Sequence, residues 1–387
     1  MEPSRTQQLL NKAVSQTKSL TKKLAYPVRR YTHILDHVAP DRSNAEANGI
    51  RNFQVLVPAE KVRFADPEQD AFVPIAKYYR DGTFDRPDIY VCDVTDGYFH
   101  VGSGLVCTRD FKAIPDLAYR LPNYSVYGKK RPVKITSRAG LFTTVNSCHA
   151  WNHFSWYVDC LARVHSLARA IPSEPVTMIM PDTVSQVMRE SLACVLPANF
   201  TLEYLPPDTW FQLEHMVWPS LVTGRCNGFL PSDYLDAIRR PIFQRLGLPL
   251  APVSADRLYV SRRNARCRCV VNEDALVALL ERYDFKVVLV EYLSFHEQVE
   301  IFHRASVVLG PHGAGLHLMG YSGKIDVVVL HPNRTPQNFF HTMAKGLGQR
   351  YHYVLTTDPG DEERNFEVDL TALEKVLRED LALTPNP

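Results

Sequence analysis

Five apolar runs, separated by segments in which apolar residues recur at helical spacing, occupy the second half of the chain. The runs lie at residues 257–261, 285–292, 306–310, 325–332 and 351–357. Most are apolar on both faces, a pattern typical of strands in a parallel sheet that helices cover. We therefore predict an α/β fold in which this half forms a doubly wound parallel sheet.

Capping signals mark helix boundaries in this half. Ser294 and Glu297 have the spacing of a capping box, in which two side chains satisfy backbone N–H groups at a helix start. Asp369 is the expected cap of a last helix over residues 370–383. We expect that helix to pack back across the other half of the chain.

The first half begins with short strands and only later shows a strand, helix, strand order. Strands are predicted at residues 53–58, 88–94, 98–107 and 133–137, with a hairpin turn at Asp96-Gly97. A long helix over residues 146–170 follows, with Ser147 as its cap and Asp159 and Arg163 as a side-chain pair. Strands at 176–181 and 201–206 then enclose a helix, which indicates an α/β unit with a β-rich start.

The chain of 387 residues is longer than a single core usually supports. Residues 246–255 contain two prolines and no helical period, so we place a domain junction there. The predicted parts are a basic tail over residues 1–50, an α/β domain over 51–250 and a second domain over 251–387.

Positive charge is concentrated in the N-terminal tail. Its first thirty residues hold seven Lys/Arg against one acid, Glu2. A basic amphipathic helix resting on the anionic inner face of a membrane is one interpretation. A solvated helical or disordered tail is the other.

The overall composition narrows the function classes. The net charge of +2 lacks the basic footprint of a nucleic-acid-binding protein. No apolar run approaches a membrane span and the N-terminus lacks a signal-peptide core, so we expect a cytoplasmic protein. The eight cysteines form no C-x-x-C pair, and Cys267 and Cys269 are too close in sequence for a structural zinc site, which favours free thiols.

The segment 306–319, SVVLGPHGAGLHLM, has the pattern of a strand, a tight turn and a helix start. Gly310, Gly313 and Gly315 fall within six residues of the turn. Glycines allow positive φ and close backbone approach to a ligand, and the first helical N–H groups favour an anion. His312 can donate to a phosphate oxygen or a sugar hydroxyl there, or it is simply a turn residue.

A cluster of cations follows the first strand of the second half. Four arginines occur within seven residues, just before Asn272-Glu273 opens a helix; they are Arg262, Arg263, Arg266 and Arg268. The planar arginine fork matches phosphate oxygens, so a diphosphate is a natural partner. The alternative is a basic surface loop paired with Glu273 and Asp274. Because this loop and the glycine turn end strands of one parallel sheet, we expect them on one rim.

Further candidates begin a helix at the same rim. Glu297 is the capping-box acid, and Gln298 can reach a nucleotide base or ribose. Four histidines, at 303, 312, 317 and 331, form no H-E-x-x-H or comparable metal motif, and no Asp-x-Asp triplet occurs. We therefore expect chemistry without a metal or another cofactor.

Several of these motifs occur together in one known family. The runs YVSRRNARCRCVVNEDAL (259–276) and LSFHEQVEIFHRASVVLGPHGAGLHLM (293–319), and a strand ending in Pro332, resemble glycosyltransferase family 61. That family includes capsular and exopolysaccharide transferases, xylan-decorating enzymes and O-linked N-acetylglucosaminyltransferases. The resemblance extends weakly to residues 152–164, where Ser155 occupies the family's histidine position. Val329 stands where the family usually has Glu.

The resemblance implies an inverting, metal-independent glycosyltransferase with two Rossmann-like domains facing a cleft, the GT-B arrangement. It implies a nucleotide-sugar donor, with UDP as the expected nucleotide, and a hydroxyl of a glycan or polysaccharide as acceptor, as in capsular polysaccharide biosynthesis. The expected catalytic residues are Asp159, His153 and His312. The expected donor-binding residues are Arg262, Arg263, Arg268, Asn272, Glu273, Glu297, Gln298, His312, Gly313, Ala314 and Gly315.

Two other functions fit the same residues. A protein that binds a sugar nucleotide or polysaccharide without turnover accounts for the Ser155 and Val329 departures. A phosphohydrolase could use the same phosphate cradle.

Overall fold

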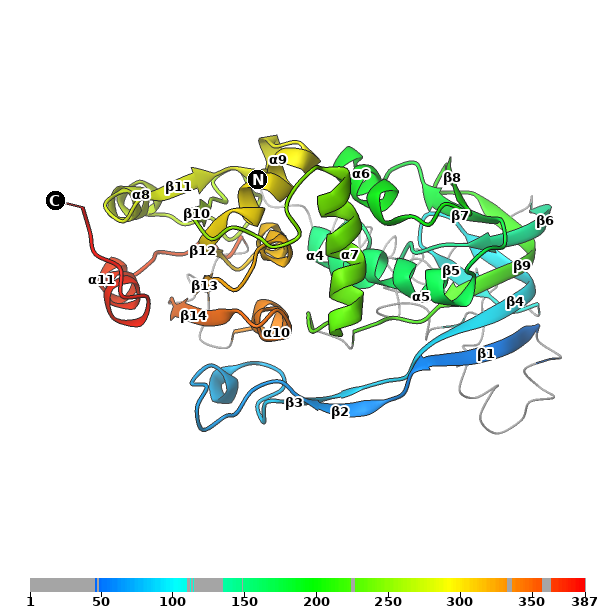
Figure 1. Cartoon of the computed structure of the whole chain (residues 1–387), viewed down its shortest axis with the longest axis horizontal. Helices are drawn as coiled ribbons and strands as arrows, with labels where there is room; N and C mark the ends of the chain where they lie inside the picture. Colours follow the sequence, from blue (N-terminus) through cyan, green and yellow to red (C-terminus); the bar gives the residue numbers. More distant parts are fainter. Residues whose placement is uncertain are drawn as a thin grey trace, which may run out of the picture.

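The computed structural model describes residues 46, 49–109, 112, 114, 135–147, 149–223, 227–332, 336–356 and 363–386. It is a mixed α/β structure with one large sheet at each end and helices between them (Figure 1). We call the part around the seven-stranded sheet the first lobe and the part around the five-stranded sheet the second lobe. The predicted basic tail lies outside the described residues, apart from Glu46, Gly49 and Ile50.

The second lobe is built on the parallel sheet that the apolar runs predict. All neighbouring strands pair in parallel, in the order β11-β10-β12-β13-β14. The strands are β10 (Asp256–Val260), β11 (Phe285–Val288), β12 (Ala305–Pro311), β13 (Asp326–His331) and β14 (Arg350–Leu355). The chain winds outward in both directions from β10 and β12, so a topological switch point lies between these two strands.

Helices cover both faces of this sheet. On one face, α8 (Glu273–Glu281) and α11 (Leu370–Lys375) pack on side chains such as Tyr259 and Leu309. On the other face lie α9 (Phe295–His303), a 3₁₀ helix over Ala314–Tyr321 and α10 (Phe339–Gly346). Strand neighbours Val307 and Val308 belong to opposite faces, which explains why the strands are apolar throughout.

The C-terminal helix does not cross to the first lobe, contrary to our expectation. Asp369 caps α11 as predicted, accepting a hydrogen bond from the Ala372 N–H at 3.0 Å. Glu374 of α11 accepts hydrogen bonds from Arg282 at 2.7 Å and from the Tyr283 hydroxyl at 2.9 Å, next to α8. Leu373 and Leu377 are buried against the same layer, so this helix completes the outer face of the second lobe.

The sheet of the first lobe is mixed. Its strand order is β1-β4-β9-β6-β7-β8, with β5 paired to β4. β1, β4 and β9 pair antiparallel, whereas β9, β6, β7 and β8 pair in parallel. The strands are β1 (Ile50–Val57), β4 (Ile89–His100), β5 (Leu105–Cys107), β6 (Thr136–Thr143), β7 (Val176–Pro181), β8 (Phe200–Leu205) and β9 (Trp210–Pro219). The β-rich start and the parallel pairing of β7 with β8 agree with the sequence prediction.

The predicted hairpin at Asp96-Gly97 is wrong. β4 continues through both residues, and Asp96 takes a positive φ of 53°. The ladder to β9 pairs Thr95 with His215 and Gly97 with Leu213, so the register of the two strands continues unchanged past Asp96. The turn comes at residues 101–104 instead, where the Gly104 N–H donates to the His100 carbonyl at 3.0 Å.

The long helix of the first lobe begins later than predicted. It consists of α4 (His153–Ser155), a π-helical segment over Trp156–Leu161 and α5 (Ala162–Ala170). The cap is Asn152, whose Oδ1 accepts the N–H of Phe154 at 2.9 Å, and not Ser147. The expected side-chain pair is also absent, because Arg163 Nε donates to the backbone carbonyl of Asp159 at 2.8 Å.

The two lobes share one continuous hydrophobic core. It joins Tyr157 and Leu161 of the long helix to Leu318 and Met319 of the second lobe. The Tyr157 hydroxyl also donates to the Gly320 carbonyl at 3.1 Å. α6 (Gln186–Val195) and α7 (Ser232–Arg245) complete the layer between the sheets, and the chain enters β10 after residues 246–255 (Figure 1). No helix among the described residues is long and apolar enough to span a bilayer.

An arm formed by residues 58–88 leaves the first lobe and reaches the second. It contains β2 (Glu60–Arg63), β3 (Thr83–Arg86) and a 3₁₀ turn over Val73–Ile75, and runs alongside α10 and β14 (Figure 1). Phe72 is buried, with ring centroids 4.7 Å from His341 and 4.9 Å from Tyr351. Asp70 pairs with His341 at 2.9 Å and with Lys345 at 2.6 Å. The arm is thus bound to the second lobe by both apolar and ionic contacts.

Candidate functional site

Two cavities open at the carboxyl ends of the second-lobe strands. The first, of about 190 Å³, lies between the ends of β10 and β12, at the switch point where doubly wound sheets bind ligands. The second, of about 300 Å³, lies between the lobes. Gly313 lines both, so the cavities meet at the glycine turn.

The glycine turn follows β12 and leads into the 3₁₀ helix Ala314–Tyr321. None of Gly310, Gly313 and Gly315 has a positive φ, contrary to the role we expected for them. Gly313 is instead required for close approach, because a Cβ atom there would lie 2.2 Å from Nη1 of Arg262. The missing side chain makes room for a guanidinium rather than for an unusual backbone conformation.

Arg262 lies across this turn and lines the first cavity. Its Nη2 donates to the Cys267 carbonyl at 2.9 Å, and its Nε is buried without a hydrogen-bond partner among the described residues. Partial burial and the neighbouring charge of Arg268 lower the pKa of Arg262. In the part of the chain that the structure describes, no carboxylate forms an ion pair with Arg262 or Arg268. The two guanidinium groups are therefore free to bind an anionic ligand.

Arg268 fixes the protonation state of His312. Arg268 has a positive φ of 59°, and its Nη1 donates to the His312 carbonyl at 2.5 Å and to Nδ1 of the same ring at 3.2 Å. A guanidinium only donates, so Nδ1 accepts and the ring proton resides on Nε2. Burial and the charge of Arg268 lower the pKa of His312 to about 3, which keeps the ring neutral.

The Nε2 atom of His312 takes no part in these hydrogen bonds. It is buried and has no hydrogen-bond partner within the described ranges. Buried polar atoms are nearly always satisfied in folded proteins, so a lone buried N–H at a cavity indicates a ligand acceptor. His312 lines the second cavity, where its Nε2–H can donate to a ligand oxygen.

The second cavity is formed by both lobes. Arg268, His312, Gly313, Ala314, Gln337, Phe339 and Phe340 line it from the second lobe, and His149, Trp151, Asn152, Phe154 and Ser155 from the first. Trp151 is 73% exposed, although the other three tryptophans of the chain are buried. Large exposed apolar side chains beside a cavity are typical of ligand or partner contacts.

Asp159 lies behind this cavity rather than in it. Its side chain is fully buried, and Oδ1 accepts a hydrogen bond from the Thr223 hydroxyl at 3.1 Å. Burial raises the pKa of Asp159 to about 7, against the opposing effects of the Arg163 charge and hydrogen bonds from Thr223 and Ser155. Its Oδ2 has no partner among the described residues. Ser155, one turn earlier, separates the carboxyl from the cavity that it lines.

His153 points elsewhere, as its spacing from Asp159 predicts. Its ring centroid lies 5.7 Å from that of His317, and it lines neither cavity. Burial lowers the pKa of His153, and burial also lowers that of His317 to about 3. His317 donates from Nδ1 to the Ala314 carbonyl at 2.8 Å. This pair of rings packs the two lobes together next to the glycine turn.

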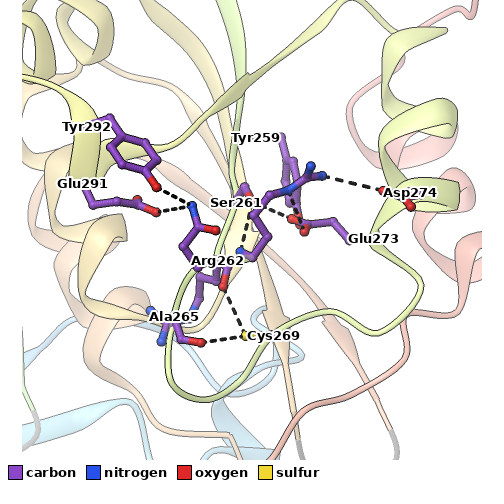
Figure 2. A network of polar contacts seen from close by, with 11 residues as sticks. Tyr259, Ser261, Arg262, Ala265, Cys269, Glu273, Asp274, Glu291 and Tyr292 are labelled. Atoms are coloured by element: carbon purple, nitrogen blue, oxygen red, sulfur yellow. Dashed lines mark hydrogen bonds and ion pairs between the residues drawn. The ribbon is translucent and has the colours of Figure 1, made fainter.

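Three predicted donor-binding residues are engaged in protein contacts. Glu273 accepts hydrogen bonds from Tyr259, Ser261 and Arg263, at 2.8, 2.6 and 3.2 Å (Figure 2). Arg263 lies 3.9 Å from Asp274 as well, so the surface-loop alternative describes this arginine. Asn272 exchanges two hydrogen bonds with the backbone of Val368. The structure places these side chains outside both cavities.

Glu297 and Gln298 lie in α9, and both form hydrogen bonds within the protein. Glu297 forms the predicted capping box with Ser294 and is exposed. Gln298 donates from Nε2 to the carbonyls of Val290 at 2.9 Å and Leu293 at 3.1 Å. Since Val290 lines the first cavity, Gln298 holds a cavity wall in place.

Sequence reasoning missed several residues that line the second cavity, and these come from both lobes. Trp151, Gln337 and Phe339 meet there only because α4 and α10 approach each other in the folded chain, and their spacing gives no sign of it. Within the described residues, no group of three or more His, Cys, Asp or Glu side chains could hold a metal ion.

The chain matches known proteins over this region. Residues 151–329 match the family model described as glycosyltransferase 61. Over 115 residues the chain is 34% identical to the EGF domain-specific O-linked N-acetylglucosamine transferase of Drosophila melanogaster. The aligned segment is 28% of this chain and only 22% of that relative. The resemblance that the motifs indicate is therefore confirmed, and residues 151–329 carry the sequence pattern of the glycosyltransferase 61 family.

Proposed function

We propose that this protein is a glycosyltransferase that moves a sugar from a nucleotide-sugar donor, a UDP-sugar, to a hydroxyl group of a glycan or polysaccharide acceptor. The observation that carries the proposal is that Arg262 lies against Gly313 and Arg268 against His312, and that neither guanidinium forms an ion pair with a carboxylate of the described residues. The match to glycosyltransferase 61 supports the same reaction class.

The donor occupies the rim of the second lobe in this proposal. The two guanidinium groups and the Nε2–H of His312 hold the pyrophosphate and stabilise the charge that develops when the nucleoside diphosphate leaves. These fixed positive groups supply the stabilisation that a divalent cation provides in other enzymes, so we propose metal-independent transfer. His312 is then a hydrogen-bond donor, because Nδ1 is already bonded to Arg268.

The acceptor enters the second cavity from the first lobe. Its hydroxyl oxygen forms a bond to the anomeric carbon, and the bond from that carbon to the phosphate oxygen breaks with inversion. The acceptor proton passes to Ser155, whose own proton passes to Asp159. A carboxyl with a pKa of about 7 is suited to this role near neutral pH. His153 has no part in the step, because it faces His317.

The proposal assigns residues 51–250 to the acceptor side and 251–387 to the donor side, a GT-B-like arrangement of two lobes facing a cleft. It is supported by the second cavity, which both lobes line. Cytoplasmic location, contact of the basic tail with a membrane and a role in capsular polysaccharide synthesis stay predictions from the sequence.

Calorimetric titration with UDP in the presence of EDTA tests the donor site. We expect Arg262→Ala to weaken UDP binding about 30-fold or more, since a charged hydrogen bond contributes about 2 kcal/mol. Arg266→Ala removes an exposed charge from the same loop and should bind UDP like the wild type.

Turnover is tested by UDP release from a panel of UDP-sugars. His312→Ala should slow release more than it weakens UDP binding. Unchanged affinity in Arg262→Ala together with unchanged rates in His312→Ala contradicts the proposal. Nucleotide binding without release by the wild type favours the second candidate, a sugar-nucleotide-binding protein, which the Ser155 and Val329 departures from the family pattern also favour.

A further inference from the structure

The first cavity is lined by an acidic side chain that is not among the predicted site residues. Glu291 lies in the short 3₁₀ turn Val290–Tyr292, directly after β11, and lines the cavity together with Arg262. In the sheet order, β11 is the neighbour of β10 on the side away from β12. The carboxylate is therefore at the same edge as the glycine turn, two strands away from it.

A neighbouring amide holds one oxygen of this carboxylate. Asn264 donates from Nδ2 to Oε1 of Glu291 at 3.2 Å and to the Tyr292 hydroxyl at 3.2 Å (Figure 2). Oε2 has no hydrogen bond or ion pair in the described part of the chain, and Glu291 forms no ion pair with Arg262. The side chain is thus oriented by a neutral group and keeps acceptor capacity for a ligand.

The first cavity has a positively charged wall and a negatively charged wall, and these suit different ligand groups. Arg262 and the backbone at Gly313 and Gly315 favour an anion at one wall, whereas Glu291 repels phosphate and accepts only from donors such as hydroxyl groups. Both walls belong to one cavity of about 190 Å³, so the ligand group that meets Glu291 lies close to the anionic group at Arg262. The group next to a pyrophosphate in a nucleotide is the ribose, which carries two adjacent hydroxyls.

We propose that Glu291 accepts hydrogen bonds from the ribose hydroxyls of the donor nucleotide and so selects ribonucleotides over deoxyribonucleotides. The inference rests on the proposed nucleotide-sugar donor. Asn264 is a positioning residue that orients the carboxylate. Loss of one ribose hydroxyl leaves the carboxylate with an unmade hydrogen bond, which lowers affinity.

Calorimetric titrations with UDP and 2′-deoxy-UDP test this. The wild type should bind UDP about tenfold more tightly than 2′-deoxy-UDP. In Glu291→Ala that ratio should fall to about one, whatever the change in absolute affinity from removing a negative charge near the phosphates. The control is Glu300→Ala, which removes an exposed carboxylate from α9 and should keep the wild-type ratio.

A wild-type protein that does not distinguish the two nucleotides overturns the inference, as does a Glu291→Ala variant that still distinguishes them. If Glu291→Ala instead changes only the preference between UDP and GDP, the carboxylate contacts the base and the ribose assignment is wrong. Each of these outcomes leaves the proposed function intact, because UDP still binds. Failure of the wild type to bind any of these nucleotides overturns the proposed function as well.

Discussion

Gly313 and Arg262 form a pair in which a missing side chain determines where a charge lies. The glycine backbone is extended, with φ of −166°, so its conformation is open to any residue. Only the guanidinium, which would lie 2.2 Å from a Cβ atom, requires glycine at this position. The pair thus links the sequence pattern of the turn directly to the electrostatics of the first cavity.

Gly313→Ala is therefore expected to displace Arg262 without unfolding the protein. We predict UDP affinity about tenfold lower, because one charged contact is lost or distorted. Calorimetry measures the affinity and thermal melting checks the fold. Gly323→Ala is the control, since its Cβ would make an ordinary contact with Pro252 at 3.5 Å. Wild-type UDP affinity in Gly313→Ala would show that the arginine position is not set by the glycine.

The sequence predicted part of this residue-level picture. The convergence of Arg262, Arg268 and His312 follows from their placement after neighbouring parallel strands. Arg263 could not be separated from Arg262 by pattern, because consecutive side chains take different directions that only the fold decides. Its partner Glu273 is buried, and a buried carboxylate is destabilising unless a cation pairs with it. Arg263 is the cation that does so.

The elements were predicted best where the apolar pattern was continuous. All five strands of the second lobe are present, and the central strands β12 and β13 are buried along almost their whole length. The hairpin at Asp96-Gly97 failed because β4 pairs with β9 both before and after these residues, and this pairing overrides local turn preference. The helix start failed because residues 149–151 form a turn before Asn152 provides the cap.

Asn152 is the cap that the structure identifies for the helix carrying Ser155 and Asp159. Asn152→Ala should lower the free energy of unfolding by about 1 kcal/mol, because the Phe154 N–H loses its acceptor. Asn152→Ser keeps a capping oxygen and should recover most of the loss. Urea denaturation measures both variants. Equal stability of Asn152→Ala and the wild type would contradict this capping role.

At the scale of the whole molecule, the parallel sheet of the second lobe could be expected from the sequence, and a domain junction at residues 246–255 stays a prediction. The arm could not be expected, because its contacts with α10 lie more than two hundred and fifty residues away in sequence, as in the Asp70 to His341 pair. Nor does a sequence show that histidines gather in one place. The rings of His331 and His341 contact Phe72 of the arm, and the ring of His312 contacts that of His331.

This burial of neutral histidines predicts lower stability in mild acid. His312, His317 and His331 are buried, and burial lowers the pKa of each, to about 3 for His312 and His317. The unfolded chain binds protons at these histidines below about pH 6.5, whereas the folded chain does not. The free energy of unfolding therefore decreases as the pH is lowered. Each of these three histidines should lower the free energy of unfolding by about 1 kcal/mol between pH 6.5 and 5.5.

Two groups act in the opposite direction. The raised pKa values of Asp159 and of His215, which pairs with Asp93, favour the folded state as pH falls. We expect a net loss of about 2 kcal/mol between pH 6.5 and 5.5, measured by urea denaturation. His317→Gln should make the dependence on pH shallower. Stability that is constant or rises over this interval would contradict the buried, neutral state of these rings.

The arm also means that the second lobe is not encoded by one continuous stretch of chain. Residues 64–82 supply part of its outer wall from the far side of the junction. A shortened protein that begins at residue 251 would expose the aromatic rings of His341, Tyr351 and Tyr353 that Phe72 now shields from solvent. The independently producible unit therefore includes the arm, and separating the lobes by cutting at the junction would leave one of them incomplete.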